Sequence, residues 1–170
     1  MKKPKLVLLH GMIATGKTTA LYNLRERKEM KDWIIIDFCE LKKQFAHLGD
    51  EKRKEYGKKA LAAILKLLMK EKKNIVLDEM PEKSIRKYVG PQIRKYKYEV
   101  VPFQFTSKIE LSIKREAERR IARGLKPHGE KWVRDFNEHH KKVFDKNAIL
   151  IDTTKLNKKQ VVDFIIKRVR

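Results

Sequence analysis

Short apolar runs alternate along this chain with longer segments in which apolar residues recur at every third or fourth position. A short apolar run that closes on a turn or an acidic residue is typical of a buried strand. A longer segment with helical spacing is typical of a helix that buries one face and exposes the other. The pattern therefore predicts strands and helices in alternation.

Five apolar runs are expected to form strands, at residues 6–9, 33–36, 75–77, 99–105 and 148–151. Because Pro102 cannot donate a hydrogen bond to a neighbouring strand, the fourth run is expected to be irregular or at an edge. Helices are expected at residues 18–31, 51–73, 81–96 (interrupted near Gly90), 109–123, 130–144 and 161–169. In the second helix, the buried face is expected to consist of Leu61, Ile64, Leu65 and Leu68.

Alternating strands and helices indicate an α/β fold with a mainly parallel sheet that helices cover on both faces. The 170 residues suit one domain, which we expect to span residues 1–170. Ligands of such folds bind at the carboxyl ends of the strands. Gly11, Asp37 and Asp78 each follow a predicted strand, so we expect them to gather at one edge of the sheet.

The charge of the chain is strongly unbalanced. It has 43 Lys and Arg residues against 22 Asp and Glu, a formal net charge of +21. Such a charge attracts polyanions, and nucleic acid is the commonest of them. A lysine-rich surface adapted to heat is the alternative, but heat adaptation usually enriches Glu together with Lys. We therefore expect a nucleic-acid partner.

Other bulk properties narrow the class of protein. Hydrophobic residues make up 41% of the chain, enough for a core, and no apolar run approaches the roughly 18 residues of a membrane helix. The single cysteine, Cys39, excludes an internal disulfide and a cysteine-rich metal site. No ligand-like spacing joins it to any histidine. We expect a soluble, cytoplasmic protein.

One motif has a specific chemical meaning. The phosphate-loop pattern G-x-x-x-x-G-K-[ST] is matched at every fixed position by Gly11, Met12, Ile13, Ala14, Thr15, Gly16, Lys17 and Thr18. In such a loop, backbone N–H groups and the start of the next helix converge on phosphate oxygens. Lys17 is expected to span the β- and γ-phosphates of ATP, or of GTP, and Thr18 to offer its hydroxyl to Mg²⁺. We include Thr19 in the nucleotide-binding set.

Two acidic residues extend this predicted site. Asp78 follows an apolar run and is expected to hold Mg²⁺, a role that Glu79 could take instead. Asp37 follows another run and is expected to accept the proton of an attacking hydroxyl group. Because strand-end carboxylates also cap helices, the alternative for Asp37 is an N-cap of a segment that begins near Glu40.

A row of arginines precedes a segment that should break a helix, since it contains two glycines and a proline. One helix face has Arg115, Arg119 and Arg123. Guanidinium groups beside such a hinge suit a lid, here at about residues 115–130, that closes over ATP and neutralises the transferred phosphoryl group. A solvated helix with a Glu116–Arg120 pair is the alternative.

With these motifs, the chain resembles the small P-loop kinases, a group that includes shikimate, gluconate, adenylylsulfate and polynucleotide kinases. The likeness extends from the loop at Gly11 to the tail at residues 148–169 and implies a three-layer P-loop NTPase fold. Within the group, the chain is most similar to the 5′-kinase domain of phage-type polynucleotide kinase, whose lid helix has R-x-x-x-R-G, here Arg119 to Gly124. The resemblance implies that Asp37 is the general base and that Arg123 touches the transferred phosphate.

One departure from those kinases concerns the acceptor. They tend to have an arginine three residues beyond the base, where it holds the 3′-phosphate of the acceptor. This chain has Glu40 at that place. Either another basic residue, such as Lys42 or Lys43, takes over, or the acceptor differs.

Three functions are compatible with these observations. The first is an ATP- and Mg²⁺-dependent kinase that acts on the 5′-hydroxyl end of single-stranded RNA or DNA. The second keeps this chemistry but transfers phosphate to a nucleoside, a nucleotide or a small metabolite. The third is a nucleotide-dependent NTPase that binds nucleic acid and has water as its only acceptor. We favour the first because of the excess positive charge.

Overall fold

The computed structural model describes residues 3–78, 84–141 and 147–170, with the backbone alone for residues 139–141. One sheet is formed by β1 (Lys5–Gly11), β2 (Trp33–Asp37), β3 (Asn74–Asp78), β4 (Glu99–Thr106) and β5 (Ile149–Asp152). The strand order is β2-β3-β1-β4-β5, and every pairing is parallel. The predicted five-stranded parallel sheet is confirmed, and each strand boundary lies within two residues of its expected place.

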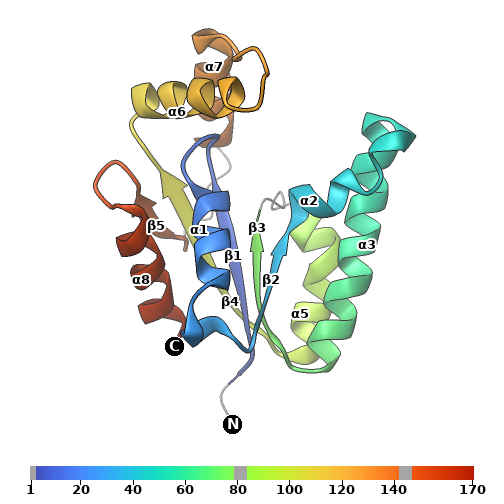
Figure 1. The fold of residues 1–170 in the computed structure, drawn as a ribbon. Coiled ribbons are helices and arrows are strands. Elements are labelled where there is room, and N and C mark those ends of the chain that lie inside the picture. Colours follow the sequence, from blue (N-terminus) through green and yellow to red (C-terminus); the bar gives the residue numbers. More distant parts are fainter. Residues whose placement is uncertain (1–2, 79–83, 142–146) are drawn as a thin grey trace.

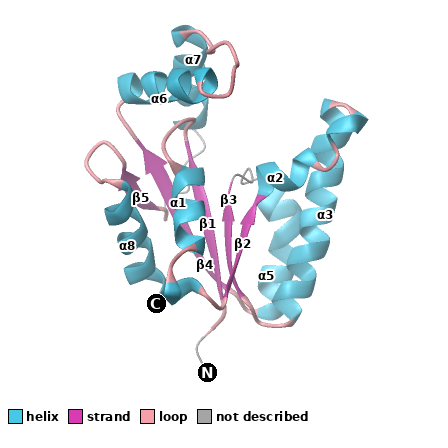
Figure 2. Ribbon diagram, viewed as in Figure 1, coloured by secondary structure: helices cyan, strands magenta, loops and turns pink. Residues whose placement is uncertain are grey.

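Helices follow the strands and lie on both sides of the sheet (Figures 1 and 2). They are α1 (Lys17–Arg25), α2 (Phe38–Lys43), α3 (Asp50–Lys70), α5 (Gly90–Tyr96), α6 (Ile109–Ile121), α7 (Glu130–Lys141) and α8 (Lys158–Val169). A π-helical turn, Ile85–Val89, precedes α5 at the expected interruption. The short helix α2 was not predicted. No helix within the described ranges combines the length and the apolar character that a membrane span requires.

Two apolar layers hold the helices against the sheet. Val7 and Leu9 of β1 pack with residues of α1 and α8 on one face. Leu6 and Leu8 point the other way and pack with residues of α3. Because successive strand residues face opposite sides, the unbroken apolar run of β1 supplies both layers at once. The result is the expected three-layer arrangement with the sheet in the middle (Figure 1).

The buried face of α3 differs in part from the prediction. Leu61 and Leu65 are fully buried as expected, but Ile64 is 37% exposed, and Met69 is fully buried in its place. Residues 61, 65 and 69 follow one another at a spacing of four and form a single stripe, whereas residue 64 lies at its margin. The prediction for Ile64 is therefore wrong.

Pro102 lies within β4, which has neighbours on both sides, but the expectation of an edge holds locally. β1 pairs along the length of β4, whereas β5 pairs only from Phe103 onwards. At Pro102 the strand thus has one paired neighbour, and a proline is tolerated there because its missing N–H can face the open side.

The carboxyl ends of the strands meet at one edge, and the pair α6–α7 lies over that edge (Figure 1). Asp37 at the end of β2 is the register partner of Asp78 at the end of β3. Leu9, two residues before Gly11, is in turn the partner of Asp78. The structure thus brings Gly11, Asp37 and Asp78 together, as the order of strands and turns in the sequence suggested.

A buried tyrosine at the opposite end of the sheet provides a test of the packing. The Tyr98 hydroxyl donates to the Lys73 carbonyl at 2.6 Å, and burial raises the pKa of Tyr98 to about 12. Its contribution to stability is complete below the unfolded-state pKa of about 10 and is lost as the pH rises towards 12. We expect Tyr98→Phe to lower the free energy of unfolding by about 1 kcal/mol at neutral pH.

The difference between wild type and Tyr98→Phe should narrow as the pH is raised above the unfolded-state value, because only the wild type then loses this contribution. Urea denaturation at neutral and at alkaline pH measures both quantities. A difference that is the same at both pH values would contradict the assignment.

Candidate functional site

The segment between β1 and α1 is a compact loop that closes around the side chain of Lys17. Lys17 Nζ donates to the carbonyls of Gly11 at 3.1 Å and Met12 at 2.8 Å. The hydroxyl of Thr15 also donates to the Met12 carbonyl, at 2.9 Å. Gly16, the N-cap of α1, has a φ of 90°, which turns the chain from the loop into the helix. The N–H groups of the first turn of α1 have no partner within the helix. The ammonium group is thereby held inside a ring of backbone, next to a helix N-terminus that attracts anions.

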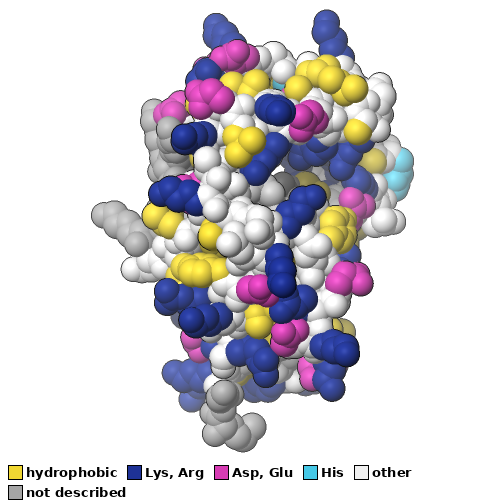
Figure 3. Space-filling model, turned by 60° about the vertical axis from the view of Figure 1, so that its left-hand side comes forward, with side chains coloured by type: hydrophobic (Ala, Val, Ile, Leu, Met, Phe, Trp, Pro, Cys, Tyr) yellow, Lys and Arg dark blue, Asp and Glu magenta, His cyan; other side chains and the backbone are white. Residues whose placement is uncertain are grey.

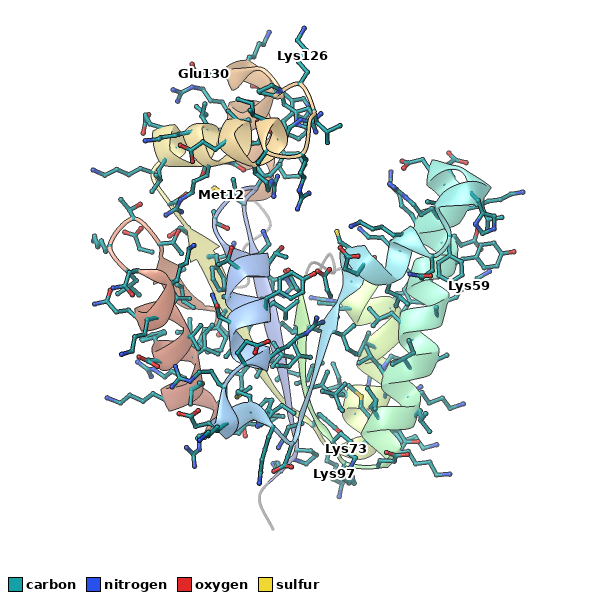
Figure 4. All side chains as sticks on the ribbon, in the orientation of Figure 1. Met12, Lys59, Lys73, Lys97, Lys126 and Glu130 are labelled. Atoms are coloured by element: carbon teal, nitrogen blue, oxygen red, sulfur yellow. The ribbon has the colours of Figure 1, made fainter. Side chains whose placement is uncertain are left out.

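Gly11 is required by a close approach to the neighbouring strand. Its φ is 146°, and a Cβ atom there would lie 2.4 Å from the carbonyl oxygen of Phe105 in β4. Met12, which follows it, turns its side chain into the interior, where it is 4% exposed. Figure 4 shows Met12 at the tip of the loop, below the helices α6 and α7. Of the predicted loop residues, Met12 therefore contributes its carbonyl rather than a side chain.

Helix α1 joins the loop to both predicted carboxylates. The Thr18 hydroxyl donates to Asp78 Oδ2 at 3.3 Å, and the Tyr22 hydroxyl donates to Asp37 Oδ2 at 3.2 Å. Thr18 and Tyr22 are one helical turn apart and so lie on the same face of α1. Burial and the adjacent Asp37 carboxylate raise the pKa of Tyr22, which keeps its hydroxyl protonated as a donor.

Asp37 has a second set of contacts that belongs to the fold. Its Oδ1 accepts from the backbone N–H groups of Cys39 at 2.8 Å and Glu40 at 3.2 Å, which makes Asp37 the N-cap of α2. The capping interpretation is thus correct. It does not use Oδ2, however, and the side chain also lines the cleft beside the loop. Oδ1 thus fixes the orientation of the group by capping α2, and Oδ2 accepts from Tyr22.

The arginine row divides into two parts. Arg119 and Arg123 line the cleft together with the loop. Arg115 also reaches the cleft, but it donates to the hydroxyl of Thr153 at 3.0 Å and to its carbonyl at 3.2 Å, which ties α6 to the end of β5. Only two of the three predicted guanidinium groups are therefore free of an anchoring contact to the sheet edge.

The helix pair α6–α7 is larger than the predicted lid of residues 115–130. It extends from Ile109 to Lys141, with the break between the helices where it was expected. The Glu116–Arg120 pair has a separation of 3.7 Å, but Glu116 is fully buried and also bonds His128 Nδ1 at 2.8 Å. The pair that the alternative interpretation placed in solvent thus has a buried carboxylate and a partly exposed guanidinium group.

Lysines from α2 and α3 line the side of the cleft opposite α6. They are Lys42, Lys43 and Lys54. Lys43 forms an ion pair with Glu40 at 2.6 Å, and the hydrogen bond to this carboxylate raises the pKa of Lys43. The cleft has a volume of about 2210 Å³, and among the described residues its lining includes ten Lys and Arg against three Asp and Glu. Lys and Arg also cover the surface shown in Figure 3, spread over it rather than gathered in one stripe.

The residues near Thr18 fit a hard cation that shares its ligands with phosphate. Hydroxyl and carboxylate oxygens suit Mg²⁺, which usually takes only one or two protein ligands. Within the described ranges, no group of three or more His, Cys, Asp and Glu side chains could hold a metal by itself. Glu79, the alternative ligand, lies outside the described residues.

Neither a protein-family model nor a curated protein sequence matches this chain. Its structure is similar to a candidate kinase of Chloroflexus aurantiacus, with a TM-score of 0.74, 12% identity, and coverage of 99% of this chain and 100% of that one. A gluconokinase of Sinorhizobium meliloti 1021 matches with a TM-score of 0.63 and 11% identity, and the match covers 99% of this chain and 95% of that one. A chain of the Pnkp1/Rnl/Hen1 RNA repair complex matches with a TM-score of 0.65 and 21% identity, and the match covers 88% of this chain but only 49% of that one. The chain thus shares its fold with a candidate kinase and a gluconokinase.

Two residues that shape the site, Tyr22 and Asn137, were not predicted from the sequence. Tyr22 could have been found, because it follows Thr18 by one helical turn and faces the same strand ends. Asn137 of α7 accepts a hydrogen bond from the N–H of Ile13 in the loop at 2.9 Å. No local signal indicates that contact, since 124 residues separate the two positions.

Substitution of Gly11 tests the geometry of the loop. We expect Gly11→Ala to lower the free energy of unfolding by about 1–3 kcal/mol, because the new methyl group overlaps the Phe105 carbonyl. We also expect Gly11→Ala to bind ATP more weakly than the wild type, as measured by calorimetry. Gly129→Ala is the control, since a Cβ there meets no atom within 4 Å. Equal stability of the two variants would contradict the close approach.

Proposed function

We propose that this protein is an ATP- and Mg²⁺-dependent phosphotransferase that phosphorylates the 5′-hydroxyl end of a polynucleotide. The observation that supports it is the arrangement within one cleft. Lys17 lies inside the loop between β1 and α1, Asp37 lines the same cleft, and so do Arg119 and Arg123. Phosphoryl transfer needs these parts: a cradle, a proton acceptor and positive charge around the transferred group.

In this mechanism the loop amides and Lys17 bind the β- and γ-phosphates of ATP, and GTP would fit the same contacts. Thr18 and Asp78 would hold Mg²⁺, which supplies positive charge to the phosphates. Asp37 accepts the proton of the acceptor hydroxyl while the oxygen of that hydroxyl bonds to the γ-phosphorus. The bond between the γ-phosphorus and the bridging oxygen of the β-phosphate breaks, so that ADP leaves. Most of the acceleration comes from positioning and from the positive charges.

The charge of the cleft favours a polynucleotide acceptor. The cleft has a volume of about 2210 Å³, which leaves room for an acceptor beside ATP. Its lining is strongly basic, and Lys42, Lys43 and Lys54 extend this character to the side opposite the arginines. A net charge of +21 would draw a polyanion towards it. The structural likeness to a chain of an RNA repair complex agrees with this choice.

A small acceptor is the second candidate, and Glu40 favours it. Glu40 lines the cleft three residues after Asp37 and puts a second carboxylate near the acceptor. A carboxylate repels a phosphate group but accepts hydrogen bonds from the hydroxyl groups of a neutral sugar or nucleoside. The fold is also that of a gluconokinase.

Transfer of labelled phosphate from ATP to a 5′-hydroxyl oligonucleotide tests the proposal directly. We expect end-labelling by the wild type, and a loss of about 100-fold or more in Asp37→Asn, because the amide cannot accept the proton. ATP binding should be retained, since the Asn oxygen can still cap α2. No labelling by the wild type with Mg²⁺ present would reject the polynucleotide acceptor.

The salt dependence of turnover separates the two acceptor classes. Binding of a polynucleotide weakens steeply with rising salt, because counterions are released from its phosphates. Turnover of a neutral metabolite should change little. A panel of sugars, nucleosides and oligonucleotides at two salt concentrations therefore identifies the class even where several acceptors react.

The role of the arginines generates a separate prediction. We expect Arg123→Ala to lower turnover by about 100-fold or more, because its charge no longer offsets that of the transferred group. Arg120→Ala is the matched control, since Arg120 donates to the Lys126 carbonyl and is not among the residues that line the cleft. Steady-state kinetics with saturating ATP measure both variants, and unchanged turnover in Arg123→Ala would reject its role.

A further inference from the structure

A buried asparagine of α7 connects the helix pair over the sheet edge to the phosphate loop. Asn137 is 1% exposed, and its Oδ1 accepts from the N–H of Ile13 at 2.9 Å. A backbone N–H can only donate, so the amide oxygen must face the loop. The contact joins two parts of the chain that are 124 residues apart.

The other end of the same side chain shows which of its atoms matters. Asn137 Nδ2 is buried, and among the described residues nothing accepts a hydrogen bond from it. A buried donor without a partner costs about 1–3 kcal/mol. An apolar side chain of the same size would avoid that cost, so the acceptor for Ile13 is what an asparagine provides at this position.

The Ile13 peptide lies at a point where the loop needs support. Two residues before it, Gly11 has a φ of 146°, and the next residue, Ala14, has a φ of 57°. A non-glycine residue with positive φ is strained and persists only when its surroundings hold it in place. The bond from Asn137 fixes the peptide between these two turns. The N–H groups that follow can then converge on one point.

We propose that Asn137 is a positioning residue for the phosphate loop and that it couples α7 to nucleotide binding. This inference rests on the proposed function only in that the loop binds a nucleotide. Since coupling between two sites is reciprocal, a nucleotide that stabilises the loop also stabilises the attachment of α7. Phe136, the preceding residue, lines the cleft, so α7 has a place beside the substrates as well.

Hydrogen exchange at the Ile13 amide tests the contact without any nucleotide. We expect exchange to be roughly threefold to tenfold faster in Asn137→Leu, the range that corresponds to the loss of one hydrogen bond. Asn137→Asp retains an acceptor and should restore slow exchange. Val133→Ala is the matched control, because Val133 is fully buried on the same helix but has no bond to the loop. Equal exchange rates in wild type and Asn137→Leu would overturn the proposal.

Calorimetry and exchange with ATP test the positioning role. We expect ATP affinity to fall by about threefold to tenfold in Asn137→Leu and to stay unchanged in Val133→Ala, although Val133→Ala lowers the melting temperature. ATP should slow amide exchange in α7 of the wild type, and this protection should be lost in Asn137→Leu.

The outcomes separate this inference from the proposed function. Faster Ile13 exchange with unchanged ATP affinity and unchanged protection of α7 would reject the positioning role and leave a structural bond. ATP binding without phosphoryl transfer would reject the proposed function alone. If the wild type binds no ATP, both the proposed function and the coupling fail.

Discussion

One face of helix α1 determines the arrangement of the site. Thr18 and Tyr22 reach the carboxylates at the ends of β3 and β2, which are neighbours in the sheet and register partners. One turn of helix and one inter-strand step are both about 5 Å, so one pair of side chains can meet the other. The same helix begins at the loop that holds Lys17, and the apolar side of α1 lies in one apolar layer with residues of β1 and β3. The residues to which the proposed function assigns the phosphate cradle, the metal ligands and the proton acceptor are therefore held together by one packed element.

The loop itself is supported from three directions. Lys17 and Thr15 bond the Met12 carbonyl from within, β4 closes on Gly11 from the side, and Asn137 holds Ile13 from α7. Ala14, which follows Ile13, has a strained φ of 57°, and such strain is kept where surrounding contacts over-determine the chain. A loop held in this way can present its N–H groups without reorganising when a phosphate binds.

The sequence predicted those features that short segments determine. A phosphate loop is contiguous, and an apolar run that ends on a turn marks a buried strand, so the loop and the sheet could be inferred. The early start of α8 also had a signal, because Asn157 and Gln160 form a capping box. The contact of Asn137 and the extent of the pair α6–α7 had no signal in the sequence, because they depend on elements that only the tertiary structure brings together. Asp37 shows a third case: base and cap were posed as alternatives, but a carboxylate has two oxygens and the structure gives each a different neighbour.

Lys42, Lys43 and Lys54, which line the cleft opposite the arginines, all have partners within the protein. These contacts affect how the cleft could bind a phosphate of the acceptor. Lys43 is paired with Glu40 and Lys54 with Asp50, whereas Lys42 lies over the ring of Phe38. Exposed pairs of this kind contribute only about 0–1 kcal/mol. A phosphodiester that enters the cleft can therefore replace either carboxylate at little cost in free energy. Under the proposed function, Glu40 thus limits the affinity for a single phosphate without excluding a strand, because a strand offers several phosphates to several lysines at once.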